Sequence, residues 1–257
     1  MKEFFGIGGY GRAPEGFMSW QHLVFVSLLM AVMIAAAIVA GIYERGRPYE
    51  RKNRVLVISA VLIDALEVFK IIFISIREND PWRWKYLLPL FLCSIPLVAL
   101  PLCAFSKGRV KEASLDFMFI FGLLVAFMGT YGAGNNYSSY PVLSFDNVIS
   151  GITHAISGFA ALYIAVSGML VMKKRNVPVT FGIISLYCLA AYIADRLIPY
   201  NYMFLMRGDG TPYDIVYNLV NGNAVLYPLI VVGLFLVYIS LFYLAFFAIR
   251  RIRNNRK

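Results

Sequence analysis

Charged residues are scarce in this sequence: they make up 15% of its 257 residues, whereas soluble domains carry about 25%. Hydrophobic residues make up 60% of the chain, and the mean hydropathy is +0.69. This composition excludes an ordinary soluble domain. It predicts an all-α, polytopic membrane protein that forms a single helical bundle across residues 1–257.

Metal-binding and nucleotide-binding motifs are also missing. The chain has three cysteines, each in an apolar segment and none in a CxxC pair, so we expect neither a disulfide framework nor a thiolate metal site. Glycines are frequent before residue 12, but no strand precedes them and no βαβ unit follows. Residues 1–19 are therefore predicted to be a flexible or interfacial segment.

Long apolar runs dominate the rest of the chain, and most are close to the roughly 20 residues that span a bilayer. We predict seven spanning helices, with the fourth as the shortest run. The predicted spans are 20–43, 55–76, 86–105, 115–130, 148–172, 179–198 and 226–249.

Most of the 24 lysines and arginines lie on one side of these spans. By the positive-inside rule, that side is cytoplasmic, the N-terminus is outside and the C-terminus is cytoplasmic. The net charge of +10 is thus explained by topology and by anionic lipid headgroups, without nucleic acid. The basic clusters are Arg45–Arg54, Lys107–Lys111, Lys173–Arg175 and Arg250–Lys257.

Several ionisable residues interrupt the apolar runs, where charge is costly and commonly marks a functional site or a structural pair. The second run contains Asp64, Glu67 and Lys70, whose spacing places them along one helix face. Glu67 and Lys70 are predicted to form an ion pair. The other ionisable residues in or near the predicted spans are His22, His154, Asp195 and Arg196.

A second stretch, Leu87–Pro101, is apolar, is interrupted by three prolines and contains Cys93. It is predicted to be a kinked helix that could place a nucleophile. Cys93 and His154 are each several residues below the outer ends of their spans, near 10 Å deep at 1.5 Å per residue. Cys103 and Cys188 lie at other depths. The sequence therefore permits a Cys93–His154 pair in the outer half of the membrane.

Such a pair suits nucleophilic catalysis, because a thiolate attacks well when a nearby imidazole accepts its proton. Glu67 or Asp195 would orient the imidazole or offset its charge. Lys70 or Arg196 would bind a phosphate or stabilise an oxyanion. Structural roles are the alternative for each residue, and His22, near the interface, is expected to be solvated.

Short motifs of the chain occur in an order that is similar to one family. The matching elements are Ser19–Leu23 (SWQHL), Glu67, Leu88–Ser94 (LPLFLCS), His154 and Asn201–Leu205 (NYMFL). In these motifs, and in its seven-span layout, the chain resembles the YwaF-type integral membrane proteins, the family of the transmembrane protein 164-like lipid acyltransferases.

The resemblance implies a cysteine that carries an acyl group as a thioester and a histidine that acts as base. These roles would fall on Cys93 and His154. His22, Asn201 and Tyr202, as residues of the matching motifs, would support the site. The implied partners are membrane phospholipids and lysophospholipids, at the cell membrane, with no metal or cofactor.

Two other functions remain open from the sequence. A small transporter or binding protein would use Asp64, Glu67, Lys70 and His154 as a relay for protons or substrate. No inverted repeat is visible in the hydropathy pattern, which disfavours transport. A lipid ester hydrolase would differ from the transferase only in passing the acyl group to water.

Overall fold

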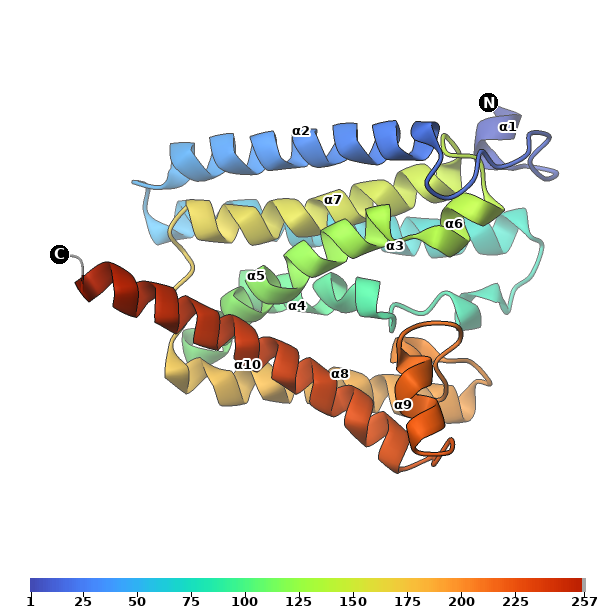
Figure 1. Ribbon diagram of the computed structural model, residues 1–257. Helices are drawn as coiled ribbons and strands as arrows, with labels where there is room; N and C mark the ends of the chain where they lie inside the picture. The colour runs from blue at the N-terminus through green and yellow to red at the C-terminus, as the bar shows by residue number, and fades with distance from the viewer. Residues whose placement is uncertain (256–257) are drawn as a thin grey trace.

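The long apolar runs form long helices in the computed structural model, which describes residues 1–255 (Figure 1). No β-strand occurs in these residues, so the predicted all-α class is confirmed. The long helices are α2 (Trp20–Glu44), α3 (Tyr49–Arg77), α5 (Gly108–Tyr131), α7 (Phe145–Val166), α8 (Val177–Leu197) and α10 (Leu226–Asn255). The short helices are α1 (Lys2–Phe5), α4 (Ile95–Phe105), α6 (Gly134–Ser139) and α9 (Tyr213–Leu219). The 3₁₀ turns are η1 (Arg83–Tyr86), η2 (Leu92–Ser94), η3 (Lys174–Asn176) and η4 (Tyr202–Phe204).

Five helices within the described residues are long and apolar enough to cross a membrane. They correspond to α2, α5, α7, α8 and α10. Helix α3 is as long as these, but it contains Asp64, Glu67 and Lys70 within its apolar part. Helix α4 has only 11 residues. Length and composition therefore support a multi-pass membrane protein with five spans, and the predicted number of seven is not confirmed.

The predicted helix over residues 86–105 is wrong in its first half. Residues 87–91 are not helical, a 3₁₀ turn follows at Leu92–Ser94, and the α-helix begins at Ile95. Proline explains this start, because Pro89 disfavours a helical conformation for Leu88 and Pro96 lies in the first turn of α4, where no N–H is needed. Pro101 is accommodated inside α4.

The predicted span over residues 148–172 is too long at its C-terminal end. Helix α7 ends at Val166, and Gly168 follows in the left-handed conformation with a φ of +78°. A glycine in this conformation is a common terminator of helices, because it has no Cβ to clash. The prediction from hydropathy therefore overlooked Gly168, which terminates the helix.

The helix connections gather at two opposite ends of the bundle (Figure 1). The α2–α3, α4–α5 and α7–α8 connections lie at the end where α10 finishes, and the first three basic clusters lie in these connections and in the helix turns next to them. The N-terminus, α1, α6 and α9 lie at the other end. Of the C-terminal basic cluster, Arg256 and Lys257 lie outside the described residues.

Helix α5 packs against α4, α7 and α8. Small residues let α5 and α7 approach closely, as is common between membrane helices. A Cβ on Gly122 would lie 2.9 Å from the Cβ of Ala161, and one on Gly158 would lie 2.7 Å from that of Ala126. This close packing fixes the position of α7, which carries His154.

The N-terminal segment packs on the end of the bundle at a buried ion pair between α3 and α7. Arg77 at the end of α3 donates to both carboxylate oxygens of Asp146, at 2.6 and 2.9 Å. The Tyr10 hydroxyl donates to the same carboxylate. Burial, followed by the bond to Asp146, raises the pKa of Tyr10 to about 12, so Tyr10 stays protonated at neutral pH.

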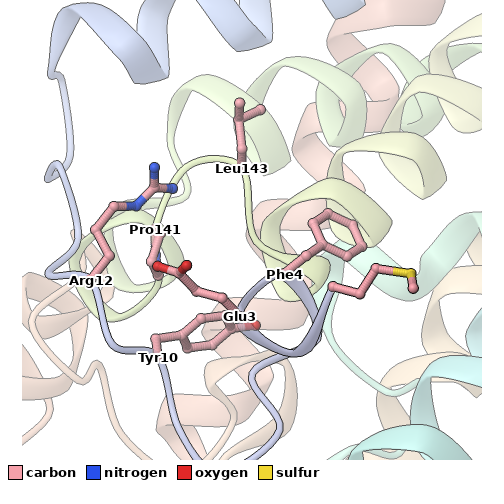
Figure 2. A pocket seen from close by; sticks show the side chains of 7 residues that line it. Glu3, Phe4, Tyr10, Arg12, Pro141 and Leu143 are labelled. Carbon is pink, nitrogen blue, oxygen red and sulfur yellow. The ribbon is translucent and has the colours of Figure 1, made fainter.

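A surface hollow of about 280 Å³ lies beside this ion pair (Figure 2). Figure 2 shows Glu3, Phe4, Tyr10 and Arg12 from the N-terminal segment around it, with Pro141 and Leu143 from the α6–α7 connection. The N-terminal segment and this connection therefore form one surface at the end of the bundle.

Candidate active site

A cavity of about 380 Å³ lies between α3, α7 and the start of α4. Its wall includes Cys93 from the η2 turn and His154 from α7, together with Glu67 and Lys70 from α3. Thus four of the sequence-predicted site residues line the same cavity. The other lining residues are Ile63, Phe91, Ser94, Leu97, Asn135, Asn136, Ser150, Thr153, Ser157 and Tyr200.

Cys93 is the exposed cysteine of the three, whereas Cys103 and Cys188 are buried in the core. The thiol residue lies in the middle of the η2 turn, directly before α4. Because the helix is interrupted here, Cys93 lines the cavity and is not packed between helices.

Two tyrosines hold the non-helical backbone that precedes Cys93. The Tyr187 hydroxyl of α8 lies 2.8 Å from the carbonyl oxygen of Pro89 and 2.9 Å from that of Phe91, both of which accept from it. The Tyr202 hydroxyl donates to the carbonyl of Lys85, and its ring packs edge-on against Phe91 at 4.9 Å. These bonds satisfy the carbonyls of Lys85 and Pro89, which have no backbone donor, whereas the Phe91 carbonyl also accepts from the Ser94 N–H at 2.9 Å.

His154 is fixed in one tautomer by its own helix. Its Nδ1 lies 2.6 Å from the carbonyl oxygen of Ser150, one turn earlier, and a carbonyl only accepts, so Nδ1 carries the proton. Nε2 is then the nitrogen with a free lone pair. It is buried and has no hydrogen-bond partner within residues 1–255.

Gly129 of α5 provides the space for this imidazole. A Cβ at position 129 would lie 2.0 Å from Cδ2 and 2.1 Å from Nε2 of His154. Any larger residue would therefore overlap the ring. The imidazole is oriented by the Ser150 carbonyl and by Gly129, not by Glu67 or Asp195 as we expected.

Glu67 and Lys70 form the predicted ion pair, with Nζ and Oε2 2.7 Å apart. Both side chains line the cavity and are mostly buried. The pair places one positive and one negative charge at the cavity wall. No hydrogen bond joins Cys93 to His154 within the described residues.

The other predicted site residues lie outside this cavity. Asp195 accepts from the Tyr202 backbone N–H at 2.7 Å, and Asn201 accepts from Met206 N–H at 2.9 Å. Both bonds shape the turn after α8, in which Met203 and Phe204 have positive φ. Arg196 is exposed on α8. Asp195, Asn201 and Tyr202 thus form the structure behind Phe91 rather than the cavity surface.

The expected solvation of His22 is wrong, because the residue is fully buried. Its Nδ1 accepts from Met18 N–H at 3.2 Å, and its Nε2 donates to the Thr130 carbonyl at 3.1 Å. Its ring packs against that of Tyr137 of α6, with the ring centroids 3.9 Å apart and the planes tilted by 36°. His22 therefore joins the start of α2 to α5 and α6. Asn135 and Asn136, which directly precede Tyr137 in α6, line the cavity.

Sequence reasoning missed several residues of the site. Ser150 acts through its main chain and Gly129 through an absent side chain, so neither gives a residue-type signal. Tyr187 is one of 17 tyrosines, and nothing in its sequence context distinguishes it. Within the described residues, no group of three or more His, Cys, Asp or Glu side chains is placed to hold a metal ion.

The fold and the cavity define a class: a helical, multi-pass membrane protein with a thiol and an imidazole in one partly polar internal cavity. The sequence matches the TMEM164 family over residues 17–252, and the chain belongs to this family. The match extends from just before α2 into the last part of α10. No curated protein and no solved structure gives a significant match.

Proposed function

We propose that this protein is a membrane-embedded acyltransferase that moves an acyl chain from a phospholipid to a lysophospholipid. A thioester on Cys93 is the intermediate, and His154 is the base. The observation that carries this proposal is the shared cavity, in which an exposed thiol and an unpartnered imidazole nitrogen lie among polar side chains. The TMEM164 family membership supports the same reading.

In the first half of the reaction, the Cys93 sulfur attacks the carbonyl carbon of the phospholipid ester. His154 Nε2 accepts the thiol proton, since Nδ1 is already committed to Ser150. The two side chains approach hydrogen-bond distance when substrate binds, because catalytic contacts commonly tighten only in the complex. Collapse of the tetrahedral intermediate breaks the ester bond, and the imidazolium gives its proton to the departing lysophospholipid oxygen.

In the second half, the hydroxyl of an acceptor lysophospholipid attacks the thioester. His154 takes the hydroxyl proton, the carbon–sulfur bond breaks, and the proton returns to the Cys93 sulfur. Lys70 holds the phosphate of either lipid, because it lines the cavity. Arg196, the other expected phosphate ligand, is not among the cavity-lining residues.

We also propose that α3 and the 87–105 segment complete seven spans, with the N-terminus outside and the C-terminus in the cytoplasm of the cell. Helix α3 has 29 residues, which exceeds the roughly 20 residues that are needed to cross a bilayer. Its Glu67 and Lys70 side chains line the cavity. Non-helical backbone before α4 suits membrane depth because it borders this cavity. The basic connections at one end of the bundle support the orientation.

The function is tested with purified protein in liposomes that contain a phospholipid with a labelled acyl chain and an unlabelled lysophospholipid. The wild type should transfer the label to the lysophospholipid. Cys93→Ala and His154→Gln should abolish transfer, while Cys188→Ala, which removes a buried thiol outside the cavity, should keep it.

Two results would contradict the proposal. Normal transfer by Cys93→Ala would exclude the thioester mechanism. Labelled free fatty acid as the sole product, with the acceptor present, would show that water takes the acyl group and that the protein is a hydrolase.

A further inference from the structure

Ser94 has a hydroxyl that the fold leaves unused. It is the N-cap residue of α4, a position where serine normally accepts a bond from an N–H of the first turn. Its side chain makes no such bond, and one of the first-turn residues is Pro96, which has no N–H. The Ser94 hydroxyl makes no hydrogen bond to other described residues, although the residue is buried and lines the cavity.

The backbone N–H of Cys93 is a second unused donor. Cys93 lies in the first turn of η2, where no earlier helical carbonyl is available, and its N–H has no acceptor on another residue within residues 1–255. Cys93 and Ser94 are consecutive residues of η2, and both line the cavity. Two unused donors therefore lie next to the nucleophile in the chain, one on Cys93 itself and one on the following residue.

We propose that the Ser94 hydroxyl and the Cys93 N–H form the oxyanion hole of the acyl transfer. This inference rests on the proposed function. When the sulfur attacks, a carbon–sulfur bond forms and the carbonyl electron pair moves to oxygen. The negative oxygen accepts from both donors until it reforms the double bond and expels the lysophospholipid oxygen, which takes its proton from His154. Ser94 is thus a catalytic residue, because it touches the reacting oxygen.

The test compares two reactions of the same thiol in detergent-purified protein. Acylation by p-nitrophenyl octanoate passes through a tetrahedral oxyanion, and intact-mass spectrometry follows the acyl adduct on Cys93. Alkylation by iodoacetamide attacks a saturated carbon and forms no oxyanion. The ratio of the two rates therefore separates oxyanion stabilisation from the reactivity of the thiol.

Ser94→Ala should slow acylation about 100-fold, as is typical when one oxyanion donor is lost, and leave alkylation nearly unchanged. Ser94→Thr, which keeps a hydroxyl, should restore much of the acylation rate. Ser59→Ala is the matched control, because Ser59 is also buried but donates to the Val55 carbonyl away from the cavity.

Acylation of Ser94→Ala at the wild-type rate would overturn the assignment of Ser94. Equal slowing of acylation and alkylation would overturn it too, since Ser94 would then act only on the thiol. Failure of the proposed function is distinguished by a separate measurement, the acylation of Cys93 in the wild-type protein. If neither the octanoate ester nor phospholipid acylates wild-type Cys93, the thioester mechanism and the oxyanion hole both fall.

Discussion

The imidazole of His154 is held by contacts that leave one nitrogen free. The Ser150 carbonyl fixes the proton on Nδ1, and the backbone at Gly129 lies directly against the ring. A base needs this arrangement, because its lone pair must be available and its position defined. The local geometry of α5 and α7 is therefore part of the proposed catalytic apparatus.

Gly129→Ala should impair transfer without unfolding the protein. The new Cβ would overlap Cδ2 and Nε2 of His154, so the imidazole must move, and a misplacement of about 1 Å can cost about 100-fold in rate. Gly182→Ala on α8 is the control, since its Cβ would meet no atom within 4 Å. Transfer by Gly129→Ala at the wild-type rate would contradict a catalytic position for His154.

At the residue scale, the sequence predicted which side chains share a depth but not how they are oriented. Counting residues from the span ends placed Cys93 and His154 in one layer, and both line the cavity. The Glu67–Lys70 pair followed from helical spacing. The partner of His154 was not predictable, because a main-chain carbonyl is present at every position and only the side-chain rotamer selects it.

Among the elements, the break between residues 87 and 94 has the largest effect on the site. A continuous helix would have packed Cys93 against its neighbours. The break leaves the Pro89 carbonyl without a backbone donor, and the Tyr187 hydroxyl of α8 donates to it. An unsatisfied buried carbonyl is costly, so this tyrosine stabilises the conformation that presents the thiol.

Tyr187→Phe should lower stability by about 1–3 kcal/mol, because it leaves the Pro89 carbonyl without a donor. Thermal unfolding in detergent, monitored by circular dichroism, measures the change. Tyr192→Phe on the same helix is the control, since the Tyr192 hydroxyl makes no hydrogen bond within the described residues. An equal effect of the two substitutions would show that the Tyr187 bonds contribute nothing specific.

Helix existence was predictable from apolar runs, whereas helix ends depended on proline and glycine. The three prolines between residues 87 and 101 predicted a kink, and the structure shows a complete break because two of them precede or begin α4. Gly168 ended α7 before the apolar run ended. In both cases backbone conformation, not hydropathy, decided the boundary.

The whole molecule has one end rich in basic connections and one end formed by α1, α6 and α9 (Figure 1). Length and apolar composition support five spans within the described residues, because α3 carries ionisable residues in its apolar part and α4 has only 11 residues. Two of the α3 residues, Glu67 and Lys70, line the cavity. Helix α3 and the segment before α4 thus carry part of the site although hydropathy identifies them least well, whereas α7, which carries His154, is long and apolar enough to span.

The proposed orientation predicts which loops react from outside the cell. In a Cys93→Ala background, Asn223→Cys in the connection before α10 should react with a membrane-impermeant maleimide on intact cells. Lys107→Cys, between α4 and α5, should react only after permeabilisation. The remaining native thiols, Cys103 and Cys188, are buried and should stay silent. The reverse labelling pattern would invert the topology.

The thioester on Cys93 is tested by the intact mass of the purified protein after incubation with phospholipid and without acceptor. The wild type should gain the mass of one acyl chain, the adduct should be released by hydroxylamine or by added lysophospholipid, and Cys93→Ala should gain nothing. A wild-type protein that transfers acyl chains without any adduct, or an adduct that persists in Cys93→Ala, would contradict a thioester on Cys93.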